Sequence, residues 1–327
     1  MMGGARNIHV IEGPRSWHNR ALNALMRLML RSPLRYDADI VALRRRYEEI
    51  DARHFQVESW VTREPVTCDG VAAEWISVPE SRPERVLLYL HGGSFAFRYP
   101  NTHARFAARL CRQLQARALM PDYRLAPEHP YPAAPDDCEA AYRWLLAQGV
   151  DPRQLVLIGD SAGGNLVLVT IRRARRAPLA GPACAVLLSP AVDCTLSSPS
   201  MADNVDLDPL MRLSNLLVVR HHYAPSPALY HDPEVSPLFG DFTGFPPLLL
   251  QTGSTEILRD EAVRVAEKAG AAGVDVELEI WPETPHVFQI VPFLPESAQA
   301  AERIAGFVRA RTGWDQASPA GAARTSR

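Results

Sequence analysis

The chain has 327 residues, of which 47% are hydrophobic and 22% charged, and this length is enough for one large domain with a deep core. Its 35 basic and 37 acidic residues give a formal net charge of −2, so the chain lacks the basic surface of a nucleic-acid-binding protein and no nucleic-acid partner is expected. No apolar run reaches the roughly 18 residues of a membrane span, which predicts no stable membrane insertion.

The cysteines indicate a reducing compartment. They are odd in number, are scattered and form no C-x-x-C pair, so buried free thiols are expected rather than disulfides or a zinc site. The first residues also lack the apolar run and cleavage site of a signal peptide. These two features predict a cytoplasmic location. The five thiols are Cys68, Cys111, Cys138, Cys184 and Cys194.

The N-terminal part, residues 1–55, is predicted to form a helical cap segment. Residues 17–52 have helical periodicity with a break near Pro33, and the first half carries an apolar face that includes Leu22, Leu25 and Leu28. Three arginines at 44–46 would suit a helix on a membrane surface. Acidic residues at 48, 49 and 51 favour instead the solvated face of a helix that covers the main domain.

Beyond residue 55 the pattern changes to strands that alternate with helices. Short, continuously apolar runs separated by helix-length segments are typical of a parallel sheet covered on both faces, so we predict an α/β fold with a mostly parallel central sheet. The predicted strands are 56–62, 72–78, 85–90, 116–121, 155–159, 183–189, 247–252 and 274–281, and the predicted helices are 101–114, 135–148, 162–175 and 259–272.

One region interrupts this alternation. Residues 195–235 are rich in Pro and Ser, with a helical stretch over 210–219, and they are predicted to be a cap insertion over the carboxyl edge of the sheet. The insertion divides the core into residues 56–194 and 236–314. The tail, 315–327, is small and polar and is predicted to be disordered.

A candidate nucleophile lies in Gly159-Asp160-Ser161-Ala162-Gly163. A buried-type strand precedes this G-x-S-x-G sequence and a helix follows it, which is the strand–turn–helix that exposes a serine oxygen. The N-terminus of that helix places partial positive charge where an oxyanion would form. A phosphate-binding loop is the alternative, but the G-K-[ST] and G-x-G-x-x-G signatures are both missing.

Ser161 needs a base, and the base needs a carboxylate to orient it. In a fold of this kind they follow the serine in the order acid, then histidine. His286 comes just after the last predicted strand, whereas His221, His222 and His231 lie in the insertion. The acid is expected in the loop after the strand 247–252, where Glu256 is the first candidate and Asp260 the alternative.

An oxyanion hole needs backbone N–H groups close to Ser161. Ala162 supplies one because it follows the nucleophile. The others are expected from His91-Gly92-Gly93-Ser94, which follows an apolar strand and whose two glycines allow a substrate to approach the backbone. His91 itself is predicted to brace this loop rather than to transfer protons.

Four segments in the same order resemble the hormone-sensitive-lipase family of α/β-hydrolases: HGGSF (91–95), DYRLAPEHPYPAAPDD (122–137), GDSAGG (159–164) and PHVFQ (285–289). The resemblance covers about residues 55–312 and implies an α/β-hydrolase fold with a helical cap and a serine esterase activity. It assigns the nucleophile to Ser161, the base to His286, the acid to Glu256 and the oxyanion donors to Gly92, Gly93, Ser94 and Ala162.

The chain departs from the family pattern at two positions. The acid is usually aspartate, so the glutamate keeps Asp260 open as a competitor, and Ser94 replaces a glycine whose site now carries a side chain near the acyl pocket. The stretches GSTEILRDEA and HVFQ are most similar to bacterial acetyl esterases and monoterpene ε-lactone hydrolases. These similarities imply a carboxylesterase for small apolar esters with short acyl chains, or for lactones, that requires neither a metal nor an organic cofactor.

Two other functions remain to be weighed. Some relatives of this fold are small-molecule receptors that lost the histidine, and the presence of His286 argues against that alternative; an amidase or peptidase with the same triad stays open. Relatives often pair through their last strand and helix, so a homodimer through residues 274–312 is an expectation by analogy. Asp122 and Arg124 are predicted to pair in a structural role, and Phe95, Phe97, Phe288 and 210–219 to line either a pocket or the core.

Overall fold

The computed structural model describes residues 8–11, 16–29 and 34–315. Its described strands form one sheet in the order β1-β9-β8-β7-β6-β4-β5-β3-β2, parallel from β1 to β5 and antiparallel at the β5-β3 and β3-β2 pairs. The predicted mostly parallel sheet is therefore confirmed. The strands are β1 (Ile8–Val10), β2 (Thr62–Cys68), β3 (Val71–Ser77), β4 (Val86–Leu90), β5 (Arg117–Pro121), β6 (Leu155–Asp160), β7 (Cys184–Leu188), β8 (Leu248–Gly253) and β9 (Val276–Trp281).

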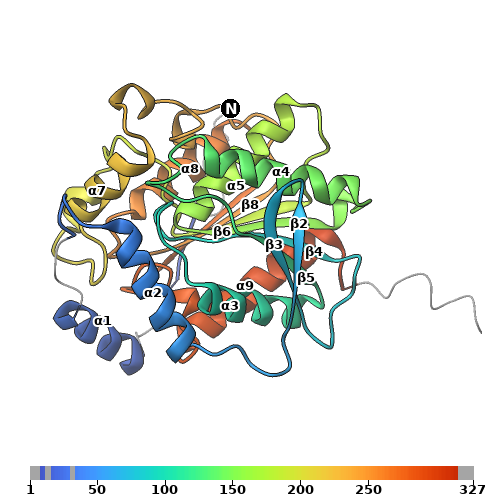
Figure 1. Ribbon diagram of the computed structural model, residues 1–327, viewed down its shortest axis with the longest axis horizontal. Coiled ribbons are helices and arrows are strands. Elements are labelled where there is room, and N and C mark those ends of the chain that lie inside the picture. The colour runs from blue at the N-terminus through green and yellow to red at the C-terminus, as the bar shows by residue number, and fades with distance from the viewer. Residues whose placement is uncertain (1–7, 12–15, 30–33, 316–327) are drawn as a thin grey trace, which may run out of the picture.

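Helices cover both faces of this sheet (Figure 1). One layer consists of α4 (Ala133–Ala147), α5 (Ala162–Arg176) and α8 (Arg259–Ala271), and the other of α3 (Pro100–Leu114) and α9 (Pro295–Thr312). The central strands are buried on both sides, because successive side chains of a strand point to opposite faces: Leu88 enters the first core cluster and Leu87 the second. This explains why the strands are continuously apolar in sequence.

The predicted strand at 56–62 is wrong. The strand starts at Thr62 as β2, an edge strand whose residues are mostly exposed and include Pro65, so it has almost no hydrophobic signal. Val57, Trp60 and Val61 produce the apolar alternation that precedes it, but they pack against the core from an irregular segment. The three-residue β1 at the opposite edge was not predicted.

The N-terminal segment contains α1 (Trp17–Met29) and α2 (Ile40–His54), and the segment after β7 contains the short α6 (Ser200–Asp203) and α7 (Leu213–Tyr223). Helices α2 and α7 meet on the loop that follows β4, where Ile40, Phe97 and Val219 belong to one buried cluster. The predicted break near Pro33 and all but the first residue of the predicted disordered tail lie outside the described residues.

Arg44 attaches α2 to the body of the protein. Its guanidinium donates to the carbonyl oxygens of Ala96 and Ala126 and pairs with Glu128 at 2.8 Å. This arginine of the 44–46 run therefore faces protein rather than a membrane surface. In the described part of the chain no helix combines the length and the apolar character needed to cross a membrane.

The predicted pair between Asp122 and Arg124 is also wrong. Asp122 pairs with Arg98, and Arg124 pairs with Asp137 at 2.7 Å while its backbone N–H donates to the same carboxylate. Side chains two residues apart in an extended chain point to the same side, but Asp122 and Arg124 each pair with a residue from another segment. Both pairs are structural, as expected for this segment.

Candidate active site

Ser161 sits at a tight turn between β6 and α5. Its backbone has φ 51° and ψ −118°, a conformation that residues other than glycine rarely adopt. The turn leaves no room for neighbouring side chains: a Cβ on Gly163 would lie 1.9 Å from the carbonyl oxygen of Leu90, and one on Gly159 would lie 2.3 Å from that of Gly163. The glycines of the motif are therefore required by close backbone contact.

Three predicted side chains meet beside this turn. His286, in the loop after β9, has its Nε2 3.0 Å from Ser161 Oγ and its Nδ1 2.7 Å from Glu256 Oε2. Because a carboxylate can only accept, Nδ1 carries the proton and Nε2 of the neutral ring is free to accept the serine proton. The arrangement suits nucleophilic attack on a carbonyl carbon.

Glu256 is fully buried and tightly held. Its Oε1 accepts from Ser189 Oγ at 2.7 Å, from Thr252 Oγ1 at 3.2 Å and from the backbone N–H of Gly253. The other oxygen is thereby aimed at His286. Ser189, the first residue after β7, also accepts from the backbone N–H of Val287, next to the histidine.

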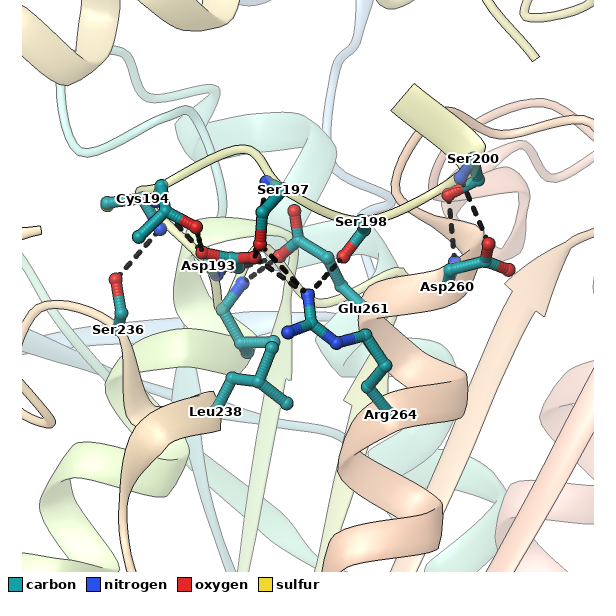
Figure 2. Close-up of polar contacts among 12 residues, drawn as sticks. Asp193, Cys194, Ser197, Ser198, Ser200, Ser236, Leu238, Asp260, Glu261 and Arg264 are labelled. Atoms are coloured by element: carbon teal, nitrogen blue, oxygen red, sulfur yellow. Dashed lines mark hydrogen bonds and ion pairs between the residues drawn. The ribbon is translucent and has the colours of Figure 1, made fainter. Parts of the chain in front are cut away.

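Asp260, the alternative acid, lies elsewhere. Its carboxylate accepts from the backbone N–H of Ser200 at 2.9 Å and pairs with Arg259 at 2.7 Å. Figure 2 shows Asp260, in the first turn of α8, facing Ser200 in the segment that follows β7. Its position supports Glu256 as the partner of His286.

The environment of His286 favours its protonated form. Burial alone would lower the pKa of His286, but the hydrogen bond and negative charge of Glu256 outweigh it and raise the pKa above the ordinary 6.5. The ring is therefore a stronger base than a free histidine. A ring with these properties can take a proton from Ser161 and return it later.

Asp160, which sequence reasoning passed over, ties the loop after β4 to the nucleophile turn. Its buried carboxylate accepts from Tyr89 Oη at 2.7 Å and from the backbone N–H of Gly92 at 3.0 Å, and it lies 3.5 Å from His103. Burial alone would raise the pKa of Asp160, yet the charge and hydrogen bond of His103, with the Tyr89 bond, hold it below its usual value. The sequence signal was only its place inside the motif.

His91 occupies the role expected of it. Its Nδ1–H donates to the Gly92 carbonyl at 2.7 Å and its ring stacks on Tyr123, whose hydroxyl donates to the His91 carbonyl. Burial, with the charge of His103, lowers the pKa of His91 to about 4, so the ring is neutral at physiological pH. It braces the loop, and its ring makes no hydrogen bond to Ser161, whose hydroxyl is bonded to His286.

The prediction for Gly92 needs correction, because its N–H already donates to Asp160. Among the described residues no acceptor is found for the backbone N–H groups of Gly93, Ser94 and Ala162. Gly93 and Ser94 both have positive φ, 117° and 56°, and Ala162 is the first residue of α5. Of the four predicted oxyanion donors, three therefore remain as candidates, and their N–H groups are unpaired, as an oxyanion site requires.

A pocket lies beside Ser161, with mainly apolar walls. Phe95 stacks flat on Tyr223 at a ring distance of 3.7 Å and lines it, whereas Phe97 and Phe288 belong to buried clusters. Within the predicted 210–219 stretch, Leu216 and Val219 face the pocket. Its other lining residues include Ala191, Asp193, Cys194, Leu196, Arg220, Leu258 and Glu261.

The polar end of this pocket is a fixed hydrogen-bond cluster (Figure 2). Buried Glu261 accepts from the backbone N–H groups of Val192 and Asp193, and Arg264 reaches Asp193 at 2.9 Å and Ser198 at 2.9 Å. Burial and the nearby Asp193 raise the pKa of Glu261 well above its usual range. These contacts fix the loop that follows β7 to α8.

Comparison with known proteins gives consistent matches. Residues 87–290 match a family model described as alpha/beta hydrolase fold. An esterase of Acinetobacter venetianus is 35% identical over 89% of this chain and 96% of its own length, and an acetyl-hydrolase of Streptomyces hygroscopicus is 39% identical over 76% of this chain and 83% of its own.

Solved structures agree. The crystal structure of an esterase from the bacterial hormone-sensitive lipase family superposes with a TM-score of 0.85 at 37% identity, covering 92% of this chain and all of the other. The structural similarity therefore extends over most of the chain.

The contact between Gly163 and the Leu90 carbonyl yields a stability test. Gly163→Ala is expected to lower the free energy of unfolding by more than about 3 kcal/mol or to prevent folding, because the added Cβ would overlap backbone atoms of Leu90 and His91, which cannot move aside as a side chain can. Gly270→Ala, in an open position within α8, is the control and should stabilise by up to about 1 kcal/mol. Equal urea midpoints for the two variants would contradict the claimed contact.

Proposed function

The chain belongs to the α/β-hydrolase fold family, and within it we propose that this protein is a serine carboxylesterase that hydrolyses small apolar esters with short acyl chains, or lactones. The observation that carries the proposal is the hydrogen-bonded chain from Ser161 through His286 to Glu256, next to three unpaired N–H groups and an apolar pocket. The names of the relatives, esterase and acetyl-hydrolase, support the same class of reaction.

The reaction takes two steps. Ser161 Oγ attacks the ester carbonyl carbon while its proton passes to His286 Nε2, and Glu256 stabilises the imidazolium so formed. The N–H groups of Gly93, Ser94 and Ala162 hold the negative carbonyl oxygen. His286 then gives its proton to the departing alkoxide, and a water deprotonated by the same ring hydrolyses the acyl-enzyme.

We further propose that α2 and the 195–235 insertion together form a cap over the site; β1, which lies within the predicted cap segment 1–55, instead extends the sheet beside β9. Helix α7 supports this role because Leu216 and Val219 line the pocket while Val218 and Val219 pack with Ile40 of α2. An acyl chain that enters the pocket meets this helix on one side and the Glu261 cluster at the end. The space therefore favours short chains.

Ser161→Ala should abolish hydrolysis of a short p-nitrophenyl ester, with a loss in kcat on the order of 10⁶ while circular dichroism and the melting temperature stay unchanged. The reason is that no other described nucleophile lies within reach of His286 Nε2. Measurement of the residual rate, with a fluorophosphonate label as a second readout, decides the matter. A folded variant that retained turnover would remove Ser161 from the mechanism.

The assignment of the acid can be tested against its competitor. Glu256→Gln is expected to lower kcat by about 10²- to 10⁴-fold, whereas Asp260→Asn should change kcat little. The reverse ranking of the two variants would make Asp260 the acid.

The pH dependence of the rate gives a further test. His286 must be neutral to act as a base, so its raised pKa predicts that wild-type activity falls as pH drops through a value above 6.5. In Glu256→Gln this fall in activity should move to lower pH, because the carboxylate that raises the pKa has been removed.

Leu216 tests which part of the substrate the pocket holds. Leu216→Ala removes part of the pocket wall, so on a series of esters from acetyl to decanoyl the preferred acyl chain should become longer. The ratio of kcat/KM for longer acyl chains to kcat/KM for short ones should rise by about tenfold. The matched control is Leu217→Ala, the exposed neighbour on the same helix, whose profile should remain that of wild type. A shift with alcohol size in place of acyl size would assign the pocket to the leaving group.

A further inference from the structure

Helix α1 turns its apolar side to solvent. Trp17, Ala21, Ala24, Leu25 and Leu28 recur at helical spacing and are all exposed, with Trp17 at 66% and Leu28 at 83%. A surface helix of a globular protein normally has the opposite orientation, with its apolar stripe on the core. We call these five residues the α1 stripe.

The orientation is set by contacts on the inner face of the helix. Asn19 and Asn23 are buried and donate to the carbonyl oxygen of Glu283 at 3.2 and 2.7 Å. Leu22, between them, packs on the buried cluster that holds Trp281 and Phe288. The helix therefore cannot roll its outer stripe inward without breaking two hydrogen bonds made by buried asparagines.

The charge carried by α1 itself has one sign. The helix contains Arg20 and Arg27 and neither Asp nor Glu, whereas Arg35, farther along the chain, pairs with Asp37. Arg20 is exposed beside the stripe and makes no ion pair with a described residue. Arg27 donates to the carbonyl of Leu207, another exposed apolar residue, and makes no ion pair with a described residue.

We propose that the α1 stripe docks the protein on an anionic phospholipid surface. An outward apolar face flanked by arginines is the pattern of a helix that lies in the plane of a membrane interface. The helix has 13 residues, or about 20 Å, which is too short to cross a bilayer and long enough to lie along one. Arginine side chains add attraction to anionic headgroups.

A second copy of the chain fits this surface less well. In a symmetric dimer each residue of the patch faces its own counterpart or near neighbours, so arginines would approach arginines with no acid in the helix to offset them. An anionic lipid surface supplies the missing charge.

The position of α1 relates docking to the site. The Glu283 carbonyl that anchors the helix lies three residues before His286, in the same loop. Lipid bound at the stripe would therefore lie close to that loop, where esters dissolved in the membrane could be taken up. The docking proposal itself goes beyond the esterase proposal and does not rest on it.

Vesicle co-sedimentation tests the proposal. The full chain should bind phosphatidylcholine vesicles that contain phosphatidylglycerol at least about tenfold more tightly than pure phosphatidylcholine vesicles, and salt at about 1 M should weaken the binding. Ser161→Ala should bind as wild type does, so a failure of the esterase proposal would leave this result unaffected. Equal affinity for both kinds of vesicle, or none for either, overturns the proposal.

Variants locate the contact. The double change Leu25→Ser with Leu28→Ser, and separately Arg20→Glu, should each weaken binding by about tenfold or more, with unchanged circular dichroism. Phe55→Ser and Arg53→Glu, exposed at the end of α2, are matched controls and should bind as wild type does. Controls that weaken binding as much as the α1 variants would overturn the assignment to this helix.

Trp17 gives a direct readout because it is part of the stripe. Lipids brominated on their acyl chains should quench part of the tryptophan fluorescence, and Trp17→Phe should remove that part. Sedimentation velocity without lipid tests the alternative that a second copy of the chain binds the α1 stripe. A concentration-dependent dimer that Leu28→Ser dissolves, together with absent quenching, would show that the stripe binds a second copy and would refute lipid docking.

Discussion

The hydrogen bond between His286 Nε2 and Ser161 Oγ depends on parallel strands that end at the same level. The register pairs Asp160 with Leu188, Leu188 with Gln251 and Gly253 with Trp281, so β6, β7, β8 and β9 deliver their following loops to one edge of the sheet. Ser161, Glu256 and His286 are far apart along the chain, yet each follows one of these strands. The 3.0 Å separation is thus a product of strand register before it is a property of any loop.

The glutamate at position 256 is accommodated by the way its loop is built. A longer side chain has more rotamers to lose, and a free carboxylate would swing between them. Three donors on Oε1, from Ser189, Thr252 and the Gly253 backbone, fix that oxygen and direct the other to His286. The extra methylene is absorbed because the carboxylate turns back onto the end of its own strand.

The sequence was sufficient for features that repeat or that need a particular residue type. Continuous apolar runs located the central strands within about two residues, and the order of Ser161, Glu256 and His286 along the chain led to side chains that do meet. Prediction from the sequence failed where the outcome depends on contacts with distant residues. The residues of β2 are mostly exposed and show no strand pattern, and the N–H of Gly92 donates to Asp160. Neither the supporting role of Ser189 nor that of Asp160 has a pattern along the chain, because both act across the sheet.

Helix α1 also shows what sequence periodicity leaves undetermined. Its periodicity predicts an apolar face that includes Leu22, Leu25 and Leu28, but periodicity alone does not tell which direction is inward. In the structure Leu22 packs on the core while Leu25 and Leu28 lie outside, because two buried asparagines occupy the inner face and donate to the Glu283 carbonyl. A polar contact between distant parts of the chain thus decides the orientation of an amphipathic helix. The free energy that hydrophobic burial would have supplied remains available to an external surface.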